Sequence, residues 1–305
     1  MKYRHSFLSI VLAVILAALP AGSQQPAAAE NVGDCPAEPL AFHTCALAKA
    51  KTFNPPRTSS GKPNLQGYFR SRLAQAFSVE GVSGSEPLVA NPVMPWALAP
   101  PMVVDPPDRK IPYQPWAASI GRIGENYYKY LDPRTACGSG GVPRLALQDA
   151  NQILQPSTDD YILWLFEDHH VHRVIAMNGR APLGDAIKMT NGESRGRWDG
   201  NTLVIDGTNF NGYTWFDDSG NFYTDAAHLV ERLTLIDPDT IHYEVTVEDP
   251  KTYTRPWKLV WALVRQKAPG FELLEEACRE GERDASRIRK AGGYKYYFGE
   301  SWRGR

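Results

Sequence analysis

The sequence lacks an excess of charge of either sign, because 33 lysines and arginines stand against 34 aspartates and glutamates. Binding to nucleic acid requires a basic surface, so a near-neutral chain is not expected to have a nucleic-acid partner. Outside its N-terminus the sequence also lacks an apolar run of roughly 18 residues, the length that spans a membrane. No stable membrane insertion is therefore expected.

Several short motifs that would determine a reaction are also missing. The sequence contains no Cys-x-x-Cys pair, no phosphate-binding loop and no His-Glu-x-x-His motif. The first of these absences disfavours thioredoxin-like redox chemistry and covalent c-type haem. No local motif indicates a cofactor, and none is predicted.

The N-terminal segment has the pattern of an export signal. Lys2 and Arg4 precede an apolar stretch over residues 7–19, and small residues that suit signal cleavage follow it. We therefore predict a signal peptide over residues 1–29 and a mature protein that is periplasmic or secreted.

The cysteine content agrees with export. Four cysteines, an even number in an exported chain, indicate two disulfides among three possible connectivities. We favour a local link between Cys35 and Cys45 and a long-range link between Cys137 and Cys278.

Composition divides the mature chain into three segments. Residues 30–52 form a predicted cap clipped by the local disulfide, and residues 53–150 form an arm that wraps the rest of the protein. Of the 24 prolines, 12 fall within residues 53–116, which disfavours regular helix or strand there. Residues 151–305 are predicted to form a β-barrel domain that ends in a helix over residues 272–290.

The barrel prediction depends on a series of strand-length segments separated by short turns. The strongest turn signal is Asp199-Gly200, which predicts a hairpin with a type I′ turn. About eight strands in an antiparallel meander must bury one face, and closure into a lipocalin-like barrel achieves this. The predicted strands cover residues 152–155, 161–167, 171–177, 193–198, 202–210, 228–236, 241–248 and 259–265.

Several longer motifs resemble an uncharacterised family of bacterial exported proteins. They are Pro-Arg-Thr at 56–58, Gly-Lys-Pro-Asn-Leu-Gln-Gly at 61–67, Trp-Asp-Gly-Asn-Thr-Leu-Val at 198–204, Glu-Asp-Pro at 248–250 and Thr-Arg-Pro-Trp at 254–257. The resemblance implies export and one shared fold, but no reaction and no catalytic residue. The family pattern has a single histidine at one hairpin tip, where this chain has three.

That hairpin tip is the sharpest local feature. On an extended strand His170 and His172 share a face and lie about 6.6 Å apart along the chain, which suits two imidazoles on one metal ion. Asp168 would be a third ligand. A metal-dependent enzyme that uses His169, His170 and His172 is one hypothesis, and an exposed polar tip with no metal is the favoured interpretation.

A second candidate site lies on the later strands. His228 and Arg232 share a face of one predicted strand, and His242 and Glu244 share a face of the next. If this face points into the barrel, the four side chains would converge and act in acid/base catalysis or ligand orientation. If it points outward, they are solvated.

Aromatic residues are frequent along the meander, and an incompletely filled barrel would present them to a ligand. The leading hypothesis is an exported protein that binds, and by extension converts without redox chemistry, a small apolar or aromatic molecule. The alternatives are the metal-dependent enzyme and a structural or interaction protein with a filled barrel, while the oligomeric state stays open. The predicted ligand-binding residues are Trp164, Phe166, Tyr243, Trp215 and Trp261.

Overall fold

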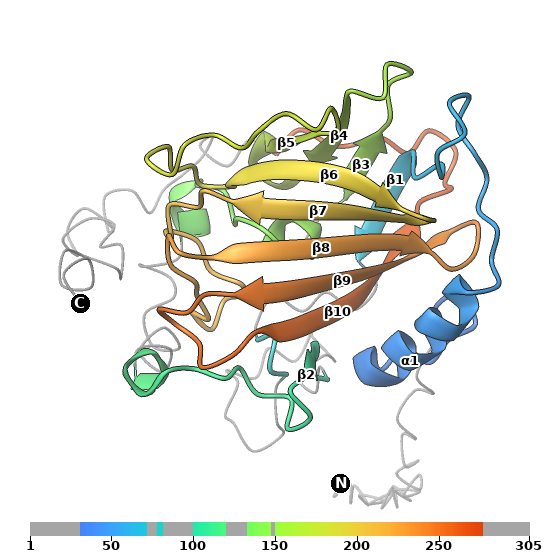
Figure 1. Cartoon of the computed structure of the whole chain (residues 1–305). Helices are drawn as coiled ribbons and strands as arrows, with labels where there is room; N and C mark the ends of the chain where they lie inside the picture. Colours follow the sequence, from blue (N-terminus) through green and yellow to red (C-terminus); the bar gives the residue numbers. More distant parts are fainter. Residues whose placement is uncertain (1–30, 72–77, 82–99, 120–132, 148–149, 277–305) are drawn as a thin grey trace, which may run out of the picture.

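The fold is seen in a computed structural model that describes residues 31–71, 78–81, 100–119, 133–147 and 150–276 (Figure 1). The chain is mainly β, as the sequence predicts. Its helices are α1 (Pro39–Ala50) and the short 3₁₀ helices η1 (Pro133–Ala136), η2 (Arg144–Ala146) and η3 (Asp168–His170). Its strands are β1 (Gly67–Ser71), β2 (Val103–Asp105), β3 (Asn151–Leu154), β4 (Tyr161–Phe166), β5 (His172–Ala176), β6 (Glu193–Asp199), β7 (Thr202–Thr208), β8 (His228–Leu235), β9 (Thr240–Glu248) and β10 (Trp257–Arg265).

Nine of these strands close into a barrel. The order is β1-β3-β4-β5-β6-β7-β8-β9-β10, and β10 pairs back onto β1 with Phe69 opposite Arg265. Strand β1 pairs with the C-terminal end of β10, and strand β2 pairs with its N-terminal part near Leu259. The barrel prediction is confirmed, with one strand more than expected. The extra strand is β1, which comes from the proline-rich segment.

One junction differs from an antiparallel meander. Strands β5 and β6 are parallel, with Ile175 opposite Ser194. The 16 residues between them, 177–192, carry the chain back across the barrel before β6 begins. A hairpin turn cannot connect parallel strands, which need a crossover of about a dozen residues or more. Residues 177–192 are long enough to provide it.

The Asp-Gly hairpin is present, but its turn differs from the prediction. Asp199 pairs with Thr202, so Gly200 and Asn201 are the two loop residues. Gly200 has φ +59°, whereas Asn201 does not have positive φ. A positive φ at the first central residue alone is typical of a type II′ turn and not of type I′.

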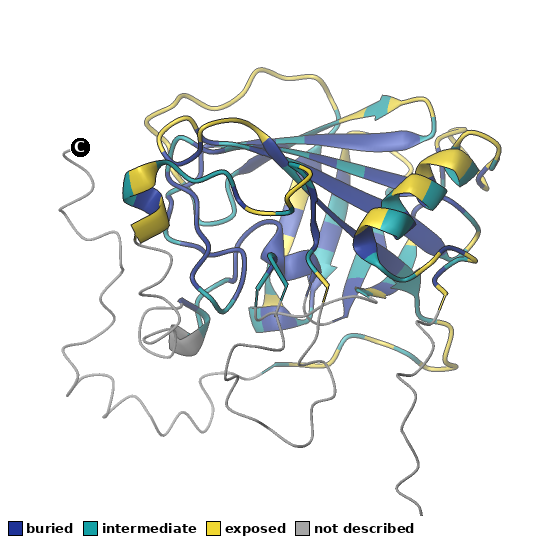
Figure 2. Cartoon of the chain, turned by 90° about the horizontal axis from the view of Figure 1, so that it is seen from below, coloured by how far each residue is buried: buried dark blue, intermediate teal, exposed yellow. Residues whose placement is uncertain are grey.

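Strand alternation determines the two faces of the barrel wall. Along β9, Ile241, Tyr243, Val245 and Val247 belong to the main core inside the barrel. The residues between them face outward, and much of this outer surface is still buried (Figure 2). The outer wall therefore has a second covering layer.

Helix α1 provides that covering. Phe42 and Ala46, one turn apart, are fully buried and pack with Val260 and Ala262 on the outside of β10. The Glu38 side chain caps the helix by accepting the N–H of Ala41 at 2.8 Å. The helix forms within the predicted cap over residues 30–52, because its apolar face has a barrel wall to cover.

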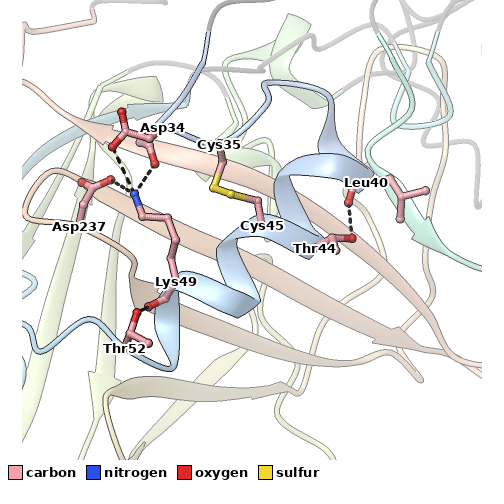
Figure 3. The surroundings of a disulfide bond; sticks show 9 residues. Asp34, Cys35, Leu40, Thr44, Cys45, Lys49, Thr52 and Asp237 are labelled. Atoms are coloured by element: carbon pink, nitrogen blue, oxygen red, sulfur yellow. Dashed lines mark hydrogen bonds and ion pairs between the residues drawn. A yellow bond between two sulfur atoms is a disulfide. The ribbon is translucent and has the colours of Figure 1, made fainter.

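The Cys35–Cys45 disulfide ties the preceding loop to α1, which confirms the predicted local link (Figure 3). Lys49 of the same helix donates to the Gly33 carbonyl at 2.6 Å and lies 3.9 Å from Asp237. A disulfide fits an oxidising compartment, in agreement with the predicted export.

Three predictions concern residues outside the described part of the chain. They are the signal peptide over 1–29, the Cys137–Cys278 disulfide, whose second cysteine lies there, and most of the helix over 272–290. Residues 272–276, which are described, are not helical. None of the described helices has the length and apolarity needed to cross a membrane.

Candidate metal centre

The four polar residues predicted on β8 and β9 do not converge inside the barrel. His242 and Glu244 alternate with the core residues of β9, so they face outward, and α1 covers them to 3% and 6% exposure. The side chains of His228 and Arg232 are 37% and 36% exposed. They lie 3.3 Å from Asp206 and 2.9 Å from Asp199, respectively. The structure therefore separates one buried pair from two half-buried residues.

A histidine that the sequence did not single out completes the buried pair. His43 of α1 places Nδ1 2.9 Å from Nε2 of His242 and 3.8 Å from Oε2 of Glu244. The three ligand atoms all lie within 4.8 Å of one another. Zinc–nitrogen bonds of about 2.0–2.1 Å place the ligands of a tetrahedral ion about 3.4 Å apart. The two imidazole nitrogens are at hydrogen-bond distance, somewhat closer than two ligands of one ion, and the three atoms together lie near the spacing of a metal site.

Protonation favours metal ligation by these groups. Burial, reinforced by the neighbouring His43, lowers the pKa of His242 to about 4. Burial also lowers the pKa of His43, although Glu244 acts in the opposite direction. For Glu244 burial would raise the pKa, but the hydrogen bond and the charge of Lys258 lower it. Near neutral pH the cluster offers two uncharged imidazoles and one carboxylate, the forms that bind metal ions.

The surroundings hold the three side chains in place. Lys258 Nζ donates to Oε1 of Glu244 at 2.8 Å and so orients the carboxylate. The buried ring of Phe42 lies 5.8 Å from that of His242. The disulfide at Cys45, two residues after His43, links the helix to the preceding loop. The site is thus built where a clipped helix meets the barrel wall.

The predicted histidine cluster is arranged differently. His169 and His170 have φ of +54° and +53°, so the chain turns at η3 and does not continue as an extended strand. His170 and His172 are exposed, while Asp168 and His169 are brought together with Glu276. The alternation assumed for His170 and His172 fails because only His172 belongs to a strand.

The Asp168 cluster is better suited to ion pairing than to metal binding. Asp168 Oδ1 accepts from Arg134 Nη2 at 2.7 Å and lies 2.8 Å from His169 Nδ1. The hydrogen bond to Asp168 raises the pKa of His169 and opposes the loss of the proton that a metal would displace. Glu276 adds a second carboxylate 3.4 Å from Nδ1. This cluster joins the hairpin tip to η1 and to the segment that follows β10.

Replacing His169 with asparagine should remove a pH-dependent part of the stability. Because the pKa of His169 is raised, its contribution is complete below its usual pKa of about 6.5 and is lost as the pH rises through the raised value. The His169 hydrogen bond and Arg134 overcome burial and lower the pKa of Asp168, whose contribution is lost only as the pH falls through that lowered value.

Urea unfolding should show a larger stability difference between parent and variant at about pH 5.5 than at about pH 9. Asparagine tolerates positive φ, so the backbone at position 169 is preserved. His172→Asn, at an exposed position of β5, is the matched control. An equal difference at both pH values would contradict the prediction.

The predicted ligand-binding aromatics are packed side chains. Trp164, Tyr243 and Trp261 have no exposed surface, and Tyr243 meets both tryptophans edge-on with ring centroids 5.7 Å and 4.6 Å away. The Phe166 ring lies tilted against that of Trp164, with ring centroids 5.2 Å apart. Trp215 belongs to a separate cluster with Ala117 and Phe222. Four of the five therefore lie together in the barrel interior.

The interior also holds a charged pair that the sequence analysis missed. Arg173 Nη1 and Nη2 donate to the two carboxylate oxygens of Glu231 at 3.0 and 2.6 Å. The Tyr243 hydroxyl also donates to Glu231, and Ser194 accepts from Arg173. Both charges occupy inward-facing positions of β5 and β8, so strict alternation along each strand was the signal that would have found them.

Residues 192–196 read Gly-Glu-Ser-Arg-Gly, the pattern of a nucleophile elbow. That elbow needs a sharp turn from strand to helix, whereas Ser194 lies within strand β6. Its buried hydroxyl accepts from Arg173 at 2.8 Å. The pattern therefore has a structural role here.

Comparisons with protein-family models, with curated proteins and with solved structures find no match to this chain.

Proposed function

We propose that this protein binds a divalent transition-metal ion on the outer wall of its barrel. The ligands are Nδ1 of His43, Nε2 of His242 and Oε2 of Glu244. The observation that carries the proposal is the meeting of these three atoms within 4.8 Å, from two elements whose histidines are 199 residues apart in sequence. The proposal departs from the expectation of no cofactor, which considered local motifs alone.

The donor set favours zinc or iron over calcium or magnesium. Imidazole suits zinc, copper, iron and nickel, whereas calcium and magnesium prefer oxygen ligands. Two histidines and one carboxylate form the protein ligand set of several catalytic zinc and non-haem iron sites. Three protein ligands leave a coordination position for water or substrate. The activity that we propose for this site therefore depends on the metal ion, which acts as a Lewis acid.

Binding of a small apolar molecule inside the barrel has less support. A cavity able to hold such a ligand would leave its walls accessible, but Trp164, Tyr243 and Trp261 have no accessible surface. Arg173 and Glu231 fill further interior space with a bonded pair. The interior is thus closer to the alternative of a filled barrel, with function on its outer wall.

Titration of the purified protein with Zn²⁺, followed by isothermal calorimetry, tests the metal site. We expect one equivalent to bind, and His43→Ala and His242→Ala each to weaken binding by more than about 100-fold, the upper range of losses for outer-shell partners. His228→Ala is the matched control, since this histidine lies on the neighbouring strand but outside the cluster. Equal zinc affinity in the parent and in both site variants would overturn the proposal.

A further inference from the structure

The charges around the candidate metal centre are unbalanced once an ion is present. Two basic side chains lie beside Glu244: Lys258 donates to its Oε1 at 2.8 Å, and Arg232 stands opposite it on β8. Arg232 is paired with Asp199 at 2.9 Å, which leaves Glu244 and Lys258 as a neutral pair. A divalent ion bound to neutral imidazoles would give the site a net charge of about +2 in a partly desolvated place.

Such a charge needs a compensating anion. Uncompensated charge in a region of low dielectric is costly, and the three protein ligands contribute only one negative charge. The remaining coordination position is where an anion would interact with the ion most strongly. Lys258 donates to Oε1 of the ligand Glu244 at 2.8 Å, so its ammonium lies beside the cluster and can donate a further hydrogen bond to the same anion.

The site is accessible from one side. The His43 side chain is 17% exposed and that of Lys258 is 37% exposed, whereas Phe42 closes the other side and is fully buried. The solvent-facing edge of the cluster is therefore the one formed by His43 and Lys258. The groups at this edge are an imidazole and an ammonium, so a polar ligand can bind there and a hydrophobic one is not needed.

From this charge balance and this accessible edge we infer that the substrate or ligand of the metal centre is a small oxyanion, a carboxylate or a phosphate-type group. One of its oxygens occupies the open coordination position, and another accepts from the Lys258 ammonium. The inference rests on the proposed metal site and adds the chemical class of its ligand. Lys258 is then a ligand-binding residue that selects for negative charge.

The test uses the protein loaded with Co²⁺, whose visible spectrum reports changes in coordination. Acetate and methylphosphonate serve as carboxylate and phosphate-type probes, and acetamide serves as an uncharged analogue of acetate. We expect acetate or methylphosphonate to change the spectrum in a saturable manner and acetamide to have no effect. Whichever probe binds more tightly identifies the type of oxyanion.

Variants at position 258 separate charge from packing. Lys258→Met should weaken binding of the anion about tenfold or more, the loss expected when a charge-assisted hydrogen bond is removed. Lys258→Arg keeps the charge and should retain most of the affinity. All measurements are made at saturating Co²⁺, so a change in metal affinity does not affect the comparison.

The outcomes distinguish the two proposals. If Co²⁺ gives no protein-bound spectrum before any anion is added, the metal site itself is wrong and this inference falls with it. If Co²⁺ binds but acetate, methylphosphonate and acetamide all leave the spectrum unchanged, only the oxyanion inference is overturned. The same holds if Lys258→Met binds the anions as tightly as the parent protein does.

Discussion

Replacing Glu231 with glutamine should lower the free energy of unfolding by about 3–5 kcal/mol, the usual cost of removing one partner from a buried ion pair. Arg173 stays charged, and Nη1 and Nη2 lose the carboxylate that accepts from them at 3.0 and 2.6 Å. Its side chain is almost fully buried, so water cannot take the place of the carboxylate. Urea unfolding followed by circular dichroism measures the difference.

Two further variants test whether burial of the ion pair causes the loss of stability. Asp225 forms a 3.0 Å ion pair with Lys251 at the surface, and Asp225→Asn should change stability by at most about 1 kcal/mol. In the double variant Arg173→Met, Glu231→Gln neither member of the pair is charged, and most of the lost stability should return. A loss for Glu231→Gln as small as that for Asp225→Asn would mean that water or a ligand reaches the barrel interior.

The strands were predictable because their pattern is local. Alternation and turn residues placed the second strand of the meander at 161–167, and the structure has β4 at Tyr161–Phe166. Strand β1 was missed because its five residues lie in a proline-rich segment and pair with β3 and β10, which come much later in the chain. The parallel pairing of β5 with β6 was missed for a related reason, since strand patterns do not record direction.

The candidate site was only half predictable. Alternation placed His242 and Glu244 on one face of a strand, but it did not decide whether that face points inward or outward. The apolar partners on the other face decide it, because Tyr243 and Val245 join the core inside the barrel. His43 had no sequence signal, since its role arises only where α1 docks, 199 residues away from His242 in sequence.

Replacing Phe42 with alanine should both destabilise the protein and weaken its metal site. The Phe42 side chain is fully buried between α1 and the barrel wall, and truncation of a buried phenylalanine costs about 3–5 kcal/mol. The same ring lies 5.8 Å from the ring of His242 and belongs to the helix that positions His43. A cavity at this point removes a packing contact beside the two histidines, whose ring nitrogens lie 2.9 Å apart.

Leu47 supplies the matched control, because it lies on the same helix but faces solvent. Leu47→Ala should leave stability and Zn²⁺ binding close to those of the parent protein, since an exposed leucine loses little burial on truncation. Chemical unfolding and zinc calorimetry on both variants separate two effects of Phe42→Ala. Loss of stability with unchanged zinc affinity would show that α1 positions His43 without the Phe42 contact, in which case the disulfide at Cys45 is the stronger restraint on the site.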